Sequence, residues 1–313
     1  MRFSVIIATY NRVDSLQRLL SSLARHFGST PIEHEVIVAD NSRDAQVEAR
    51  IHDLVARFRG EGMERLRLVR EPTPGKCAAQ NTAIRAARGE VLAFFDDDVI
   101  VAPEWLTAAA QFFEQAEFDA MQGPILVPPE METNEDFLRA QYKFRTIDFV
   151  EYRPPLREIK TLTGANMAIR REVFDRIGLF NEELGPGRSG ISEDVEFARR
   201  LIAGGGRIGY EPRAAVYHEV DWSRLTEEFF RKRHEDQGRS RLIFKRQSLA
   251  TIVPNLLRSA VAFVWYTWRG NVRKQYRAKG RFFHYRAMLL EKLRPTGAPP
   301  ARRGRAATPP RLG

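Results

Sequence analysis

In the N-terminal part of the chain, apolar runs typical of strands alternate with apolar positions spaced as on one face of a helix. Short continuous apolar runs predict strands that are buried on both faces of a sheet. The predicted strands are residues 3–8, 35–39, 65–69, where two arginines alternate with apolar residues, and 90–95. Between the first two runs the period changes, because Leu16, Leu19, Leu20 and Leu23 fall on one face of a helix. A second helical stretch, residues 78–87, lies between the last two runs, and the alternation predicts a mostly parallel α/β sheet.

The start of the first helix and the middle of the chain carry further local signals. Asp14, with Gln17 three residues later, predicts a capping box at the helix start. Residues 119–190 contain many prolines and glycines, so we expect loops and short strands there. The helical period returns from Ser192 to Ala203. Two further short strands are expected at residues 207–210 and 214–217.

Beyond residue 221 the pattern predicts basic helical segments. The most apolar stretch is Leu249–Trp268, which contains Pro254 and Arg258. Because a spanning helix needs about 20 predominantly apolar residues, these interruptions argue against a membrane span. The tail at residues 295–313 consists largely of Pro, Arg, Ala and Gly and is predicted to be disordered.

Charge is distributed unevenly along the 313 residues, whose formal net charge is +10. Residues 1–220 carry 28 Lys and Arg against 34 Asp and Glu, whereas residues 221–313 carry 22 against 6. A slightly acidic body with a basic C-terminal region indicates a module with a separate surface for anions. Cys77 is the only cysteine, so no intrachain disulfide is possible. The apolar run after Met1 is too short for a signal peptide, and we expect the body to be cytoplasmic.

Polar side chains follow three of the predicted strands, in residues 9–12, 40–42 and 96–98. The carboxyl ends of parallel strands form one edge of a sheet, where ligands bind. Asp96, Asp97 and Asp98 are adjacent carboxylates that suit Mg²⁺ or Mn²⁺, although a solvated acidic turn has the same sequence. The second loop, which begins with an aspartate, fits a base or ribose contact or a plain turn. No glycine-rich dinucleotide or phosphate-loop motif follows the first strand.

The order of six sequence blocks resembles family 2 glycosyltransferases of the GT-A fold. The blocks are residues 4–12 (SVIIATYNR), 36–42 (VIVADNS), 74–81 (PGKCAAQN), 89–98 (GEVLAFFDDD), 163–170 (TGANMAIR) and 192–197 (SEDVEF). The resemblance covers roughly residues 3–240. It implies a Rossmann-like, mostly parallel mixed sheet flanked by helices, and an enzyme that transfers a sugar from a nucleoside diphosphate.

The resemblance also implies roles for individual residues. Asp194 matches the general base, Asp40 and the first loop match the base-binding residues, and Asp96 matches the residue near the ribose. The expected nucleotide-sugar site comprises Ala8, Thr9, Tyr10, Arg12, Asp40, Lys76, Asn81, Asp96 and Asp97. The expected donor-sugar and acceptor side comprises Gly164, Ala165, Asn166 and Glu193. Asp98 matches a ligand of Mg²⁺ or Mn²⁺ on the diphosphate, and His218 is either a further metal ligand or a structural histidine.

The implied reaction is a single displacement that inverts the anomeric carbon, because one base and no protein nucleophile are present. Asp194 lies at a predicted helix start, whose dipole weakens a base, while the neighbouring Glu193 opposes that effect. Processive members carry Gln-x-x-Arg-Trp after the base. Here residues 237–241 read QGRSR, without the aromatic residue, so single-sugar addition is favoured.

The implied domain organisation places the catalytic domain at residues 1–220, with a nucleotide-binding half at 1–118 and an acceptor-binding half at 119–220. Residues 221–294 form a basic helical region that either contacts an anionic membrane surface or packs on the body. The implied acceptor is a glycan or a lipid-linked precursor, reached from the inner face of the cell membrane. Two alternatives remain open: a sugar nucleotidyltransferase, and a non-enzymatic protein that binds anionic surfaces or nucleic acid.

Overall fold

A mixed sheet runs through the centre of the structure, a computed structural model that describes residues 1–28, 30–115, 117–153 and 157–294. Its strands, in spatial order, are β3 (Leu66–Arg70), β2 (His34–Asp40), β1 (Phe3–Thr9), β4 (Val91–Asp96), β9 (Asn166–Arg170), β6 (Ala120–Gln122), β10 (Ile208–Tyr210) and β8 (Glu158–Ile159). β1 pairs in parallel with β2 and β4, and β2 with β3. β9 runs antiparallel to β4 and β6. The sheet is therefore mixed and mostly parallel at its N-terminal half, as expected.

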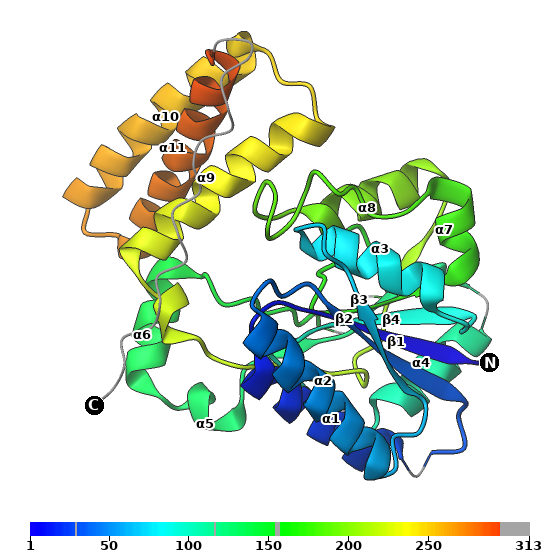
Figure 1. The fold of residues 1–313 in the computed structure, drawn as a ribbon. Coiled ribbons are helices and arrows are strands. Elements are labelled where there is room, and N and C mark those ends of the chain that lie inside the picture. The colour runs from blue at the N-terminus through cyan, green and yellow to red at the C-terminus, as the bar shows by residue number, and fades with distance from the viewer. Residues whose placement is uncertain (29, 116, 154–156, 295–313) are drawn as a thin grey trace.

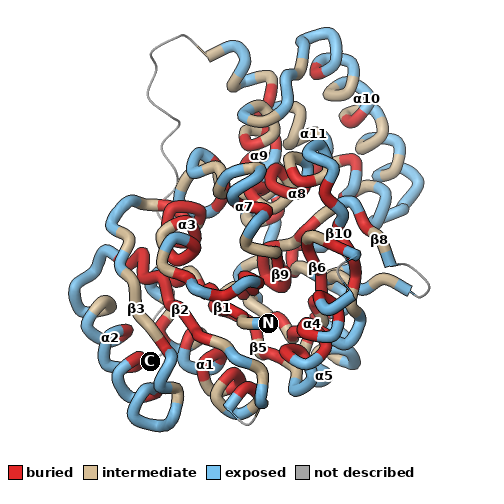
Figure 2. The backbone as a smooth tube through the Cα atoms, turned by 90° about the vertical axis from the view of Figure 1, so that its right-hand side faces the viewer, coloured by how far each residue is buried: buried red, intermediate tan, exposed pale blue. Residues whose placement is uncertain are grey.

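Helices cover both faces of the sheet (Figure 1). One face is covered by α1 (Val13–Phe27), α2 (Ala45–Gly60) and α4 (Trp105–Glu114), and the other by α3 (Lys76–Ala86), α7 (Arg171–Ile177) and α8 (Glu193–Ala203). Within β1, Val5 and Ile7 pack with the first set, and Ile6 packs with the second. This alternation explains why the strand reads as one continuous apolar run. The buried backbone in Figure 2 accordingly follows the sheet and the inner faces of these helices.

The predicted strands of the N-terminal half and the helices now labelled α1, α3 and α8 are confirmed. The predicted capping box is wrong: Arg12 is the N-cap and makes no side-chain cap bond, whereas Asp14 lies in the first turn and pairs with Arg50 at 3.3 Å. The pattern analysis also missed α2, although Ile51, Leu54, Val55 and Phe58 of that helix are buried. It missed α4, α6 (Glu135–Phe144) and α7 as well.

A small second sheet joins the chain after β4 to a distant segment. β11 (Val216–His218) lies between β5 (Val99–Val101) and β7 (Ile125–Leu126) and runs antiparallel to β5. In this register His218 lies opposite Val99, the residue after Asp98. The backbone N–H of Glu219 donates to the carbonyl oxygen of Asp98 at 2.9 Å. This pairing fixes His218 beside the acidic loop.

The C-terminal helices α9 (Glu227–Phe244), α10 (Leu249–Trp268) and α11 (Val272–Lys292) stand together at one side of the body (Figure 1). α9 follows the 3₁₀ helix η1 (Trp222–Arg224). An apolar cluster joins α6, α9 and α11 through Phe144, Phe230 and Tyr276. α5 (Pro129–Glu132) lies beside α6. The basic region is thus tied to the body through α6. The tail predicted to be disordered lies outside the described residues.

The polar residues and the proline that interrupt the apolar stretch at 249–268 do not interrupt the helix. α10 is continuous over 20 residues with Pro254 inside it. Its polar side chains bond to the helix backbone, because Asn255 Nδ2 donates to the Thr251 carbonyl and Ser259 Oγ donates to the Asn255 carbonyl, both at 2.7 Å. Within the described residues, α10 is the one helix long and apolar enough, by length and composition, to cross a membrane.

The contact between α9 and α11 depends on glycine. A Cβ atom added at Gly238 would lie 2.3 Å from the carbonyl oxygen of His284, a rigid backbone atom. We therefore expect Gly238→Ala to lower the free energy of unfolding by about 1–3 kcal/mol through overpacking. Urea unfolding followed by circular dichroism measures this effect. Gly60→Ala is the matched control, since nothing lies within 4 Å of its added Cβ, and equal losses in both variants would contradict the prediction.

Candidate active site

The carboxyl ends of β1, β2 and β4 bring three polar loops together. In the sheet register, Thr9 lies opposite Asp40 and Ala8 lies opposite Asp96. The loop after β1 turns sharply, with Asn11 at a φ of 58°, and leads directly into α1. The three segments singled out from the sequence therefore meet at one edge of the sheet, as expected of parallel strands.

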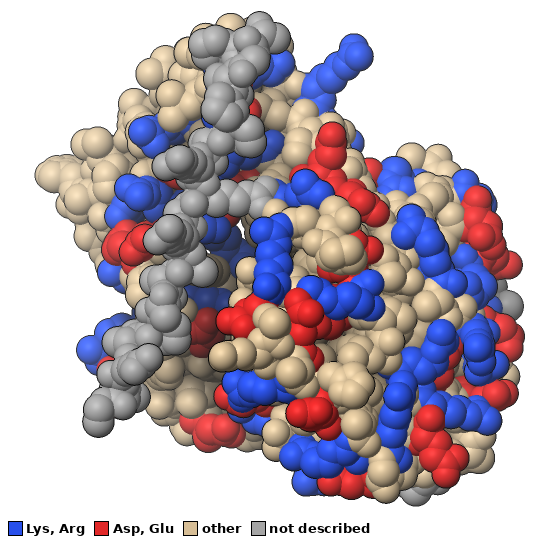
Figure 3. Space-filling model, viewed as in Figure 1, with Lys and Arg blue, Asp and Glu red and all other residues tan. Residues whose placement is uncertain are grey.

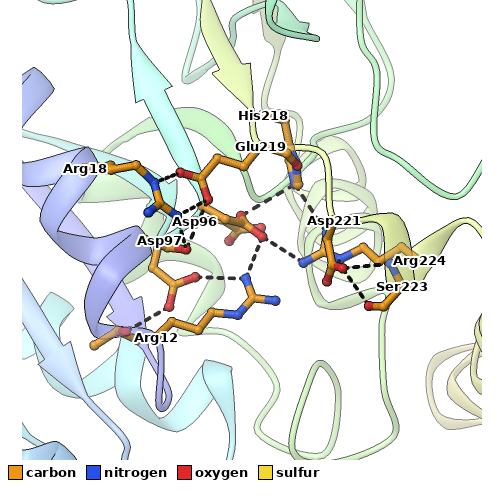
Figure 4. A network of polar contacts seen from close by, with 12 residues as sticks. Arg12, Arg18, Asp96, Asp97, His218, Glu219, Asp221, Ser223 and Arg224 are labelled. Atoms are coloured by element: carbon orange, nitrogen blue, oxygen red, sulfur yellow. Dashed lines mark hydrogen bonds and ion pairs between the residues drawn. The ribbon is translucent and has the colours of Figure 1, made fainter. Parts of the chain in front are cut away.

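Two arginines from distant parts of the chain converge on Asp98. Its Oδ2 accepts hydrogen bonds from Arg12 Nη1 at 2.5 Å and from Arg224 Nη2 at 2.7 Å. Figure 4 shows these guanidinium groups reaching the acidic loop from two sides. Burial alone would raise the pKa of Asp98, but His218 in its protonated form and the permanent charges of Arg224 and Arg12 hold that pKa well below its usual range. Asp98 is therefore ionised.

The second oxygen of Asp98 has no hydrogen-bond partner among the described residues. Oδ1 is buried, and Nε2 of His218 lies 3.5 Å from it. The Nδ1 atom of His218 donates to the carbonyl oxygen of Glu219 at 2.7 Å, and Nε2 lies 3.4 Å from Arg224 Nη1. When His218 is neutral, Oδ1 and Nε2 both present lone pairs to the same space.

Such a pair fits a divalent cation, because Mg²⁺ and Mn²⁺ take carboxylate oxygen and imidazole nitrogen. Fixing of the imidazole by a carbonyl group on its other nitrogen is typical of metal-binding histidines. No group of three His, Cys, Asp or Glu side chains within the described ranges is arranged to hold a metal alone. Asp98 and His218 would therefore need further ligands from water or from a bound substrate.

Asp97 joins the acidic loop to the first loop. Its carboxylate accepts from Thr9 Oγ1 at 2.8 Å and from Arg12 Nη1 at 3.2 Å. Burial, together with the negative charge of Asp98, raises the pKa of Asp97 to about 6, although Arg12 opposes the shift. Arg12 thus contacts two neighbouring carboxylates and holds the first and third loops in register.

Lys76, at the start of α3, joins the acidic loop to the start of α8. Its Nζ lies 2.5 Å from Asp96 Oδ1 and 3.3 Å from Glu193 Oε1. Burial would lower the pKa of Lys76, but these two carboxylates hold it well above its usual range. Three residues predicted from separate sequence blocks are therefore in one ion-pair network.

Asp194 completes this network at the first turn of α8. Its Oδ2 accepts from the backbone N–H of Gly164 at 2.9 Å, and its Oδ1 accepts from the N–H of Val195 at 2.7 Å. Burial and the negative charge of Glu193 raise the pKa of Asp194 to about 7, and the two backbone bonds oppose the shift. The weakening expected from the helix start is therefore outweighed, and the pKa suits a base at neutral pH.

Two predicted site residues turn their side chains into the protein. The amide of Asn166 accepts from Trp105 Nε1 at 2.8 Å and donates to the carbonyl groups of Pro124 and Ala214. The amide of Asn81 bonds to the backbone of Phe180 and to Glu182. These contacts indicate that both asparagines position neighbouring loops. Ala165, next to Asn166, is also buried.

The predicted base-binding side is partly preformed. Asp40 is buried, and its Oδ1 accepts from the backbone N–H of Ser42 at 2.8 Å. Its Oδ2 lies 3.9 Å from Arg70 Nη1. Tyr10 is exposed, and the neighbouring Ala8 is partly buried. The structure therefore leaves one oxygen of Asp40 and the ring of Tyr10 without a close hydrogen-bond partner among the described residues.

Sequence reasoning missed Arg224 and the glycine-rich loop that precedes Asp194. Arg224 lies in η1, and its only signal is a cation shortly after His218. In the loop, the Pro186 carbonyl accepts from the N–H of Lys76 at 3.0 Å. A Cβ added at Gly187 would lie 2.9 Å from the Cα of Gly75. This close approach fixes the loop against the start of α3, and the run of glycines was the available signal.

Comparisons with known proteins agree with the family resemblance of the sequence blocks. The profile of the family described as "Glycosyl transferase family 2" matches residues 4–178. The chain is 29% identical over 248 residues to the succinoglycan biosynthesis protein ExoM of Rhizobium meliloti, covering 77% of this chain and 74% of that protein. It is 26% identical to the chondroitin synthase of Escherichia coli, covering 69% of this chain but only 34% of that protein.

Solved structures show the same fold. The mannosyltransferase PcManGT from Pyrobaculum calidifontis, in complex with GDP-Man and Mn²⁺, superposes with a TM-score of 0.62 over 93% of this chain and 87% of its own, at 18% identity. TarS 1–349 of S. aureus, in complex with UDP-GlcNAc, superposes with a TM-score of 0.52 over 93% and 92% of the two chains, at 19% identity. Both likenesses confirm the expected fold.

Proposed function

The chain belongs to glycosyltransferase family 2, whose members use nucleotide-sugar donors, and we propose that it transfers one sugar to an acceptor hydroxyl with inversion of the anomeric carbon. The observation that carries this proposal is the position and pKa of Asp194. It is a partly buried carboxylate with a pKa of about 7, next to the Lys76, Asp96 and Glu193 network at the carboxyl edge of the sheet. Membership of this family excludes the two alternatives, a sugar nucleotidyltransferase and a non-enzymatic binding protein.

In the proposed reaction, the donor lies along the ends of β1, β2 and β4. Asp40 and the first loop would contact the base, and Asp96 and Lys76 would lie near the ribose and the phosphates. The acceptor hydroxyl would approach Asp194 on the side of Gly164. Asp194 takes the hydroxyl proton as the oxygen attacks the anomeric carbon, and the bond from that carbon to the diphosphate breaks. One displacement of this kind gives inversion.

The leaving diphosphate carries negative charge, and the residues around Asp98 suit that charge. Asp98 and His218 would hold Mg²⁺ or Mn²⁺, which when bound supplies positive charge to the diphosphate. Arg12 and Arg224 already bring two permanent cations to the same carboxylate. We expect both arginines to donate some of their hydrogen bonds to phosphate oxygens, because guanidinium groups bind phosphate well.

This assignment predicts a donor-binding role for Arg224. We expect Arg224→Gln to raise KM for the donor about tenfold, because one charge-assisted hydrogen bond to the diphosphate is lost. Arg213→Gln is the control, since Arg213 pairs with Glu211 and is exposed. Steady-state kinetics with the donor varied measure the effect, and an unchanged KM in Arg224→Gln would contradict the role.

The acceptor and the location are also proposals. We expect an acceptor hydroxyl on a glycan or lipid-linked precursor, because the ExoM relative is named as a succinoglycan biosynthesis protein. The segment at 237–241 forms part of α9 and lacks the aromatic residue of processive enzymes, which supports addition of one sugar. We place the enzyme at the cytoplasmic side of a membrane, with the basic C-terminal helices toward the lipid.

A thermal-shift panel tests the proposed donor site. UDP, GDP, dTDP and CMP are each added with and without Mn²⁺, since a ligand that binds the folded state raises its melting temperature. We expect one nucleotide to stabilise the protein and Mn²⁺ to increase its effect. The sugar nucleotides of that base are then assayed for nucleotide release. No stabilisation by any nucleotide, or no release with any sugar, would overturn the proposal.

A further inference from the structure

The outer face of α10 is apolar along the whole helix and has no partner within the described residues. Its exposed residues recur at helical spacing. They are Leu249, Val253, Leu257, Val261, Val264, Trp265 and Trp268. Leu257 is 61% exposed, Val261 70%, Val264 67% and Trp268 75%. This stripe, termed the α10 stripe, is a contiguous apolar surface of the kind that marks a protein or membrane contact.

The charges around the α10 stripe are of one sign. Between Asp236 and Glu291 the sequence contains 12 Lys and Arg and no Asp or Glu. Arg258 lies within α10, and Arg269, at its C-cap, lies 4.9 Å from the ring centre of Trp265 and 5.7 Å from that of Trp268. Among the described residues, neither of these arginines pairs with a carboxylate. In Figure 3 the outer edge of the C-terminal helices is mainly tan and blue.

This charge distribution indicates which kind of partner covers the α10 stripe. A second copy of the chain would bring two strongly cationic helix pairs together, and like charges would oppose that contact. Nucleic acid would match the charge but would leave the aliphatic stripe exposed to water. An anionic phospholipid leaflet matches both features, because it offers hydrocarbon to the stripe and phosphate groups to the flanking arginines.

The packing of α10 on α11 decides how the helix lies in the lipid. α10 and α11 form an antiparallel hairpin, in which Ile252 and Ser259 of α10 are buried. If α10 crossed the bilayer, α11 would enter with it or the hairpin would have to separate. The first half of α11 contains Arg273, Lys274, Arg277, Lys279 and Arg281. Cations of this number are costly inside a bilayer.

We propose that α10 lies in the plane of the membrane interface, with the α10 stripe inserted into an anionic leaflet and α11 on the aqueous side. This inference goes beyond the proposed transfer reaction and does not depend on it. It names the surface that holds the protein on the membrane, and it assigns an interfacial position to the one described helix that is both long and apolar enough to cross a membrane.

Vesicle flotation tests the surface. We expect the full chain to float with vesicles of phosphatidylcholine mixed with phosphatidylglycerol, and weakly or not at all with phosphatidylcholine alone. Val261→Glu with Val264→Glu should lower the partition coefficient by about tenfold or more, because two inserted aliphatic side chains are lost. Leu138→Glu, an exposed leucine on α6, is the matched control and should float normally. A melting transition by circular dichroism, unchanged in the double variant, shows that the fold is intact.

The depth of the helix is measured separately. Leu257→Trp, made with Trp265→Phe and Trp268→Phe, places an indole at the middle of α10. Bromines near the lipid headgroup should quench it more strongly than bromines near the bilayer centre. Stronger quenching from the centre would show a spanning helix and overturn the in-plane position. Equal flotation of the double variant and the unaltered chain, or self-association through the stripe without lipid binding, would overturn the membrane surface.

Discussion

Replacing Asp194 with Asn is expected to lower kcat/KM for sugar transfer by about 10³-fold, within the usual range for loss of a general base. The amide still accepts a hydrogen bond from Gly164, so the surrounding backbone is retained. The substitution does not touch the acidic loop, and nucleotide binding should therefore persist. Nucleotide-release kinetics and thermal shifts measure the two properties on the same protein.

The same variant should be more stable than the unaltered chain at alkaline pH. The folded state raises the pKa of Asp194 from 3.8 to about 7, so ionisation opposes folding increasingly as pH rises through that window. The gain in melting temperature for Asp194→Asn should thus be small at pH 4 and larger at pH 8. Asp175→Asn, an exposed aspartate on α7, is the control and should change neither activity nor stability. Full transfer activity in Asp194→Asn would show that Asp194 is not the general base.

The pH dependence of kcat/KM is a second test of Asp194 as the general base. Because only the ionised carboxylate accepts a proton, the rate should rise with pH and level off above a midpoint near 7. The negative charge of Glu193 contributes to this raised value, so Glu193→Gln should move the midpoint to lower pH. A profile whose midpoint is unchanged in Glu193→Gln would indicate that another group controls the rate.

The strands and acidic loops were predictable because their signals are local. β1, β2 and β4 are buried on both faces and read as continuous apolar runs, and parallel strands place their following loops at one edge. The blocks that carry the family resemblance supplied the remaining candidates. In the structure Lys76 forms ion pairs with Asp96 and Glu193. The sequence pattern gave no information on the distances between these side chains.

The parts that the sequence did not reveal depend on long-range packing. Asn166 was expected at the donor sugar, but its amide is used by Trp105, Pro124 and Ala214, which come from three separate segments. Arg224 reaches Asp98 only because β11 pairs with β5 and η1 follows directly. α10 continues through Pro254, and the polar side chains of Asn255 and Ser259 bond back to the helix backbone, which composition alone did not show.

Replacing Asp98 with Asn is expected to lower kcat/KM by about 10²–10³-fold and to abolish the part of nucleotide stabilisation that depends on Mn²⁺. The change removes the charge that balances Arg12 and Arg224, and it removes the one oxygen at this position that has no hydrogen-bond partner. His218→Gln leaves the carboxylate in place and should raise the half-saturating Mn²⁺ concentration by about tenfold to a hundredfold.

Metal removal separates this effect from damage to the fold. The folded state depresses the pKa of Asp98, so loss of its charge should lower the melting temperature even without metal. The relevant measurement is therefore the increment in melting temperature between EDTA-treated and Mn²⁺-loaded samples, each with the stabilising nucleotide. This increment should be present in the unaltered chain and in Asp175→Asn and absent in Asp98→Asn. An increment of equal size in all three would place the cation away from Asp98 and overturn the role of Asp98 as a metal ligand.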